Sequence, residues 1–106
     1  MTREFGEQEI VYNATKAALR AFARSWVVDL KPRDIRINVL SPGHTDTPGL
    51  DGLLNSEQKS FLAGETPLGR LGTGDDIGKA AVFLASSDSA FVTGTELIVD
   101  GGVSHI

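Results

Sequence analysis

The apolar positions between residues 11 and 30 predict a long helix with two distinct faces. Large apolar side chains recur at helical spacing along one stripe, formed by Leu19, Phe22, Trp26 and Leu30. Small side chains form a second stripe, at Ala14, Ala18, Ala21 and Ser25. We expect such a helix to pack on a sheet and also against a second surface, such as another subunit. Lys31-Pro32 should end it, because the residue before a proline avoids the helical conformation.

Further along the chain, two short strands and a second helix are predicted. Apolar residues alternate over residues 35–40, which is typical of a strand, and Ser41-Pro42-Gly43 ends this run. A helix should open at Asp75-Asp76, since an apolar stripe follows and acidic residues suit the positive end of a helix. A second strand is expected over residues 96–99, followed by a turn at Asp100-Gly101-Gly102.

Two segments lack such periodicity. Residues 1–10 are polar and mixed, which predicts a loose start. Residues 44–74 are rich in Gly, Pro and Thr, and we expect a long connection with one or two short helices, for example over residues 56–62. Connections of this length are often lids or binding loops.

The predicted order is therefore helix, strand, long loop, helix, strand. The last three elements form a β-α-β crossover, which implies parallel strands covered by helices. Two parallel strands hardly make a stable core, because parallel sheets are normally buried on both faces. The fold class is accordingly α/β, and the pattern resembles the edge of a larger parallel sheet.

Composition narrows the class of protein further. The chain has 106 residues, a net charge of −4 and no cysteine. The acidic balance argues against nucleic-acid binding, and the lack of cysteine excludes disulfides, thiol catalysis and cysteine-ligated zinc. No apolar stretch approaches the roughly 20 residues that span a bilayer, and the N-terminus lacks the apolar region of a secretory signal. We therefore expect a cytoplasmic protein without a membrane partner.

Tyr12 and Lys16 are the first candidates for chemistry, because residues four apart share one face of a helix. A phenol has an ordinary pKa of about 10. An ammonium about 4 Å away contributes roughly 4 kcal/mol at an effective dielectric near 20, which corresponds to a pKa shift of up to about three units. Such a tyrosine can exchange a proton with an alcohol or ketone near neutral pH. Taken alone, the spacing favours the simpler interpretation, a surface tyrosine and a solvated lysine.

Several further motifs follow in order and at consistent separations. They are Tyr12-x-x-x-Lys16, Asn38-x-x-x-Pro42-Gly43, Pro42-Gly43-x-x-x-Thr47 and Asp100-Gly101-Gly102. Together they closely resemble the C-terminal part of the short-chain dehydrogenase/reductase family. The resemblance covers residues 11–106, whereas residues 1–10 do not fit the family pattern. It implies a Rossmann-like, doubly wound parallel sheet of which this chain is the C-terminal portion.

The resemblance also implies a function, namely hydride transfer between NAD or NADP and an alcohol or carbonyl substrate. Tyr12 would be the acid/base, and Lys16 would lower the Tyr12 pKa and hold the nicotinamide ribose. Pro42 and Gly43 would let the backbone pass close to the nicotinamide. The Thr45 backbone and the Thr47 hydroxyl would bind its carboxamide, and residues 44–67 would be the substrate loop. The catalytic residues implied are thus Tyr12 and Lys16, and the cofactor-binding residues are Tyr12, Lys16, Pro42, Gly43, Thr45 and Thr47.

Two other candidate sites are rejected. Gly72-Thr73-Gly74 is not interpreted as a dinucleotide loop, because no strand is predicted before it and Asp75-Asp76 would repel a phosphate. A loop that leads into a helix is the better interpretation. His44 and His105 are too far apart, without other ligands, to predict a metal site.

The family's glycine-rich dinucleotide loop, its catalytic serine and the upstream asparagine of its proton relay are not found in the sequence. The isolated chain is therefore expected to be inactive. The alternative hypothesis is a non-catalytic oligomerisation or interaction module, which the two apolar stripes of residues 11–30 favour. A homo-oligomer is expected in either case.

Overall fold

A computed structural model describes the backbone of residues 3–105 and the side chains of residues 14–49 and 52–104. The chain forms two compact units. One comprises Met1–Val39 and Phe91–Glu96, and the other comprises Leu40–Ala90 and Leu97–Ile106.

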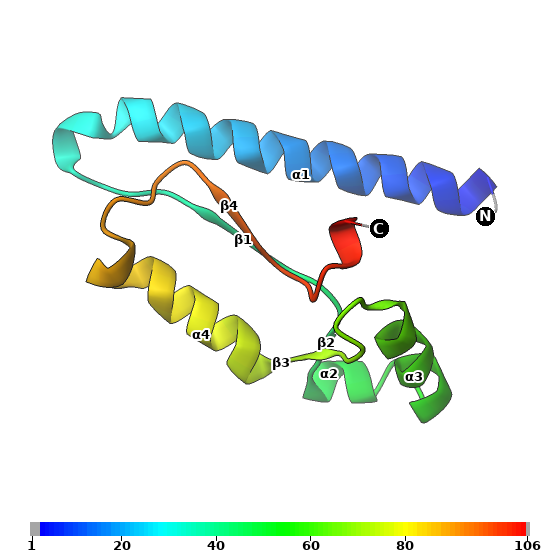
Figure 1. Ribbon diagram of the computed structural model, residues 1–106. Helices are drawn as coiled ribbons and strands as arrows, with labels where there is room; N and C mark the ends of the chain where they lie inside the picture. The colour runs from blue at the N-terminus through cyan, green and yellow to red at the C-terminus, as the bar shows by residue number, and fades with distance from the viewer. Residues whose placement is uncertain (1–2, 106) are drawn as a thin grey trace. The chain divides into compact units, whose positions relative to one another are not determined.

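The first unit is built on one long helix, α1, which spans Arg3–Asp29 (Figure 1). The helix predicted to start near residue 11 thus begins earlier, within the segment that the sequence predicts to be loose. The glutamates of this segment are good helix formers and suit the positive end of a helix, although they show no apolar period. The predicted end is confirmed: Pro32 lies in the short 3-10 helix Lys31–Arg33, which Asp34 closes with a φ of 55°.

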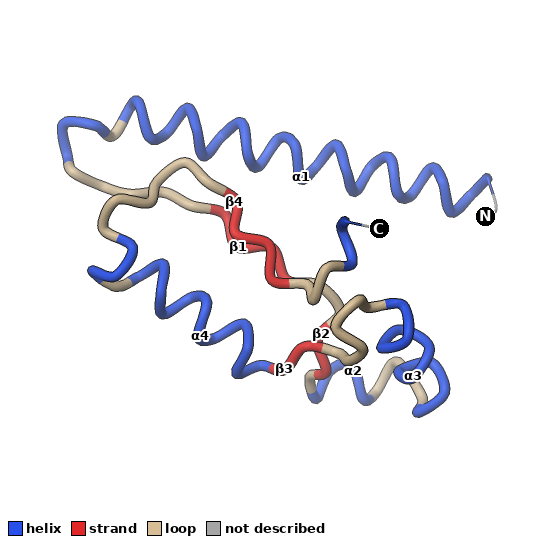
Figure 2. The backbone as a smooth tube through the Cα atoms, viewed as in Figure 1, coloured by secondary structure: helices blue, strands red, loops and turns tan. Residues whose placement is uncertain are grey.

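Strands β1 (Val39–Pro42) and β4 (Glu96–Val99) pair with each other (Figure 2). Val39 N donates to Thr95 O at 2.9 Å, and Gly43 N donates to Val99 O at 3.0 Å. Because both bonds join residues of the same sequence separation, the strands run parallel, as predicted.

The first strand begins later than the predicted residue 35. Before Val39, one backbone bond remains, from Gly94 N to Ile37 O at 2.7 Å, and side chains make the other contacts. Ile37 N donates to Thr93 Oγ1 at 3.1 Å, and the Asn38 side chain bonds to the backbone of Val92 and Thr95. Apolar alternation therefore marks an extended segment correctly but does not reveal where its ladder starts.

In the second unit, a short parallel pair joins β2 (Thr45–Asp46) to β3 (Gly72–Thr73), with Thr45 opposite Gly72 and Asp46 opposite Thr73. Helices α2 (Pro48–Asp51) and α3 (Ser56–Glu65) lie between these strands in the sequence (Figure 1). The helix predicted over residues 56–62 is confirmed and continues to Glu65. The β2–β3 pair was not predicted, because two residues are too few to show alternation.

Helix α4 (Gly74–Ala85) follows β3 directly and confirms the predicted second helix. The chain continues through a 3-10 turn, Ser87–Ser89, and ends after β4 with another, Val103–His105. The Ser89 hydroxyl, which is fully buried, donates to Leu84 O at 3.0 Å and fastens the end of α4.

Very few of the described side chains form an apolar core. Ala23 is the buried hydrophobic residue among them, at 2% exposure. On the predicted apolar stripe of α1, Phe22 and Trp26 are 53% and 49% exposed, and their rings stack with centroids 5.8 Å apart. Within the described residues, no helix combines the length and hydrophobicity needed to cross a membrane.

Candidate active site

The predicted site residues fall into two groups. Tyr12 and Lys16 lie one helical turn apart on α1 in the first unit. The side chain of Tyr12 lies outside the described residues, and Lys16 is half-buried. Pro42, Gly43, Thr45 and Thr47 lie together in the second unit, in the segment that leaves β1.

In the first unit, Asn38 fastens the loop before β4. Its Nδ2 donates to Val92 O at 3.0 Å, and its Oδ1 accepts from Thr95 N at 3.2 Å. Arg36 also donates to Val92 O, at 3.2 Å. The motif asparagine therefore holds two backbone segments together, because an amide side chain offers both a donor and an acceptor.

The geometry around Gly43 explains why this position is glycine. A Cβ at Gly43 would lie 2.5 Å from Asp100 Cβ and 2.7 Å from Asp100 Cα. Both distances are too short for any side chain. This packing is a reason for glycine in addition to the close approach of a nicotinamide that the family resemblance implies.

The residues after Gly43 are held on several sides. His44 O accepts from Gly72 N at 2.9 Å, and Thr45 Oγ1 donates to Gly43 O at 3.0 Å. Asp46 pairs with Lys59 Nζ of α3 at 3.2 Å. The segment Pro42–Thr47 is thus a fixed and largely exposed stretch at the carboxyl end of a parallel strand, where open α/β sheets bind their ligands.

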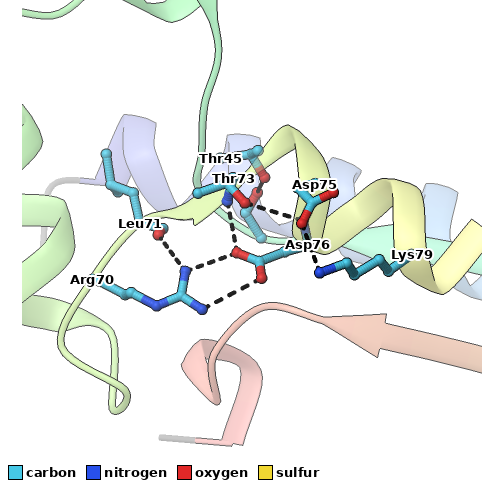
Figure 3. A network of polar contacts seen from close by, with 8 residues as sticks. Thr45, Arg70, Leu71, Thr73, Asp75, Asp76 and Lys79 are labelled. Atoms are coloured by element: carbon cyan, nitrogen blue, oxygen red, sulfur yellow. Dashed lines mark hydrogen bonds and ion pairs between the residues drawn. The ribbon is translucent and has the colours of Figure 1, made fainter.

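A charged network secures the start of α4 and with it the β2–β3 pair (Figure 3). Arg70 Nη1 donates to Asp76 Oδ2 at 2.7 Å, while Thr73 N donates to the same oxygen at 2.8 Å. Thr73 Oγ1 in turn accepts from Asp76 N at 3.0 Å, which completes a capping box. Asp75 forms a separate ion pair with Lys79 at 2.8 Å.

These contacts shift the pKa values of both Asp76 and Arg70. The hydrogen bond from Arg70, together with the bonds from Thr73, holds the pKa of the Asp76 carboxyl well below its usual range. The same hydrogen bond raises the pKa of the Arg70 guanidinium. Arg70 was not predicted from the sequence, since the Thr73-x-x-Asp76 spacing of the capping box indicates only where α4 begins.

A cavity of about 190 Å³ lies beside this network, and its lining includes His44, Arg70, Asp76 and Asp100. It is smaller than the roughly 300–1,000 Å³ that drug-sized ligands occupy. Among the described residues, no three His, Asp or Glu side chains are grouped as a metal site would require.

A parallel strand pair and a helical crossover define an α/β protein, and the polar segment at the strand's carboxyl end is its candidate ligand site, because open α/β sheets bind ligands there. A sequence model of the family described as enoyl-(acyl carrier protein) reductase matches residues 1–104. The chain belongs to the short-chain dehydrogenase/reductase family of oxidoreductases. The match includes the first ten residues, which the sequence motifs did not connect to the family.

Known proteins of several kinds are similar to this chain. An oxidoreductase of Sarocladium schorii, asL5, is 46% identical over 96 residues, which are 91% of this chain and 39% of that protein. The NADP-dependent (R)-specific alcohol dehydrogenase of Lentilactobacillus kefiri is 42% identical over 93 residues, which are 86% of this chain and 37% of the enzyme.

Among solved structures, a gluconate 5-dehydrogenase from Burkholderia cenocepacia, in complex with NADP and tartrate, matches with a TM-score of 0.76. It is 36% identical, and the match covers 90% of this chain and 38% of that one. The likeness confirms the predicted Rossmann-type fold. The chain spans well under half the length of each of these relatives.

Proposed function

We propose that this chain contributes the proton-transfer pair and the nicotinamide-facing segment of an NAD(P)-dependent oxidoreductase that interconverts alcohols and carbonyls. The observation that carries the proposal is the Tyr12–Lys16 spacing on α1 together with the fixed, exposed segment Pro42–Thr47 after β1. It is supported by the NADP dependence of the alcohol dehydrogenase and by the NADP complex of the gluconate 5-dehydrogenase.

In this mechanism Tyr12 is the acid/base. It gives its phenolic proton to the substrate oxygen during carbonyl reduction and takes it back during alcohol oxidation. Lys16, one turn along the helix, stabilises the phenolate electrostatically and so brings the phenol toward neutral pH. Its ammonium also offers three donors, which suit the hydroxyls of a ribose.

The segment Pro42–Thr47 is proposed to hold the nicotinamide. A carboxamide needs both donors and acceptors, and threonine hydroxyls with neighbouring backbone groups supply both. The Thr45 backbone and the hydroxyl of Thr47, an exposed residue, are assigned to it, and these donors and acceptors fit that group. When bound, the nicotinamide supplies or accepts the hydride.

A chimera tests this proposal. This chain replaces the matching part of the gluconate 5-dehydrogenase, whose remaining residues supply the rest of the fold. We expect NAD(P)H-dependent carbonyl reduction, and Tyr12→Phe should lower kcat by roughly 10²–10⁴-fold because it removes the transferable proton. Arg24→Gln, on the same helix, serves as the control. A Tyr12→Phe chimera with unchanged kcat would contradict the assignment.

The 106-residue chain by itself is proposed to be inactive, because its sequence lacks the family's glycine-rich dinucleotide loop. Purified chain, mixed with NADPH and a panel of aldehydes and ketones, should show no oxidation above background. Turnover that disappears in the Tyr12→Phe variant would overturn this part of the proposal.

A second candidate function is a non-catalytic oligomerisation or interaction module. It is favoured by the exposed, stacked pair Phe22 and Trp26 on α1, since contiguous exposed apolar surface marks interaction sites. Light scattering over a range of concentrations tests it: we expect a homo-oligomer, and a monomer at every concentration would refute the candidate.

A further inference from the structure

The turn that follows β4, Asp100–Gly102, has a defined backbone. Gly101 and Gly102 both adopt positive φ, 64° and 98°, a region that favours glycine. The Asp100 carboxylate holds the turn: Oδ1 accepts from Gly102 N at 2.8 Å and Oδ2 accepts from Ser104 N at 2.9 Å. The backbone conformation of the turn is therefore determined by its own residues.

This turn contacts the residue immediately before segment 44–67. Gly43 lies against Asp100 so closely that an added Cβ would approach Asp100 Cα to 2.7 Å. Gly43 N also donates to Val99 O at 3.0 Å, next to the turn. Since backbone atoms form the contact, neither side can move aside without moving the chain.

The same turn contacts the other end of that segment. A Cβ at Gly101 would lie 2.6 Å from Thr66 Cγ2, and a Cβ at Gly102 would lie 3.0 Å from Pro67 Cγ. Leu68 N donates to Gly101 O at 3.1 Å. Thr66 is 6% exposed, and its hydroxyl donates to Leu62 O at 3.0 Å, which links the turn to α3.

We propose that the Asp100–Gly102 turn is a clamp that holds both ends of segment 44–67 at once and so sets the position of α2 and α3. This rests on the proposed function only in that segment 44–67 is taken as the substrate loop. Gly101 is then a positioning residue: a side chain there pushes on Thr66 and, through the turn, loosens Gly43.

Hydrogen exchange on the 106-residue chain tests the clamp independently of activity. In the Gly101→Ala variant, amide exchange should be about tenfold faster at both ends of the segment, in residues 44–47 and in residues 63–68. Gly69→Ala is the matched control. Its φ is 78° and nothing lies within 4 Å of its Cβ position, so it adds the same backbone strain without the contact. Exchange at residues 44–47 should be unchanged in this control.

A second-site change should rescue the variant. Thr66→Ser removes Cγ2, the atom in the way, and keeps the hydroxyl that bonds to Leu62. Exchange in Gly101→Ala/Thr66→Ser should return to within about threefold of the original rate. The clamp is refuted if Gly101→Ala affects residues 63–68 alone, if Gly69→Ala acts equally at residues 44–47, or if Thr66→Ser gives no rescue.

If Gly101→Ala does not fold, Asp100→Asn takes its place, because an amide retains only one of the two acceptor oxygens that hold the turn. Faster exchange at both ends supports the clamp, and faster exchange at one end refutes it. In the active chimera, Gly101→Ala should raise KM for the carbonyl about tenfold and leave kcat within about twofold. An inactive chimera with the expected exchange pattern would reject the proposed function and leave the clamp standing.

Discussion

At the scale of single residues, Gly43 is a position with no room for a side chain. Gly43→Ala should destabilise the protein by about 1–3 kcal/mol, because its Cβ would lie 2.5 Å from Asp100 Cβ and the backbone must shift. Urea denaturation followed by circular dichroism measures this loss. Gly78→Ala, in α4 with nothing within 4 Å, should instead stabilise the protein by about 0.5–1 kcal/mol. Equal effects of the two changes would contradict the packing argument.

Asp76 makes stability depend on pH at the acid end of the range. Its contacts with Arg70 and Thr73 lower the pKa of the carboxyl in the folded protein. Their stabilising effect is therefore complete above the ordinary aspartate pKa of about 4 and is lost as the pH falls below it. Denaturation midpoints measured between pH 7 and pH 2 should decrease once the pH drops below the ordinary aspartate pKa. The decrease should be smaller in the Asp76→Asn variant. An identical pH profile in both proteins would refute the assignment.

At the scale of elements, a capping box sets where each of two helices begins, Thr73 with Asp76 at α4 and Asn55 with Gln58 at α3. Asn55→Ala should cost about 0.5–2 kcal/mol, because Asn55 Oδ1 accepts from Gln58 N at 2.8 Å at the start of α3. Asn55→Asp keeps an acceptor oxygen and should preserve stability. The two variants can be compared by hydrogen exchange in residues 56–62. Similar exchange in the alanine and aspartate variants would argue against the cap.

The same elements show what the sequence could predict. Helix α4 was predicted because its apolar period and acidic first turn are local signals. The β2–β3 pair was not, because each strand has two residues and the register depends on contacts across the chain. For the site, Asn38 and Gly43 were recognised as motif residues. Their contacts with Val92, Thr95 and Asp100 required the folded backbone.

At the scale of the whole molecule, the exposed apolar surface should dominate the behaviour of the isolated chain. Phe22 and Trp26 form a stacked patch that water contacts directly. We expect the chain to bind the dye ANS and to self-associate. The double variant Phe22→Ser/Trp26→Ser should reduce both dye fluorescence and light scattering. Phe91 is fully exposed, and the control variant Phe91→Ser should change dye fluorescence and light scattering little. If Phe91→Ser reduces both signals as much as the double variant does, no defined patch is involved.

The pairing of β1 with β4 also bears on the order in which the molecule acquires its structure. Asn38 reaches partners 54 and 57 residues further along the chain. A ribosome adds roughly 5–20 residues per second, so β4 is synthesised several seconds after β1. Helices α3 and α4, which carry their own caps, lie wholly between the two strands and need not wait. The β1–β4 pair can therefore form only after α3 and α4 have been synthesised, and until then the edge of β1 is open to pairing with a wrong strand.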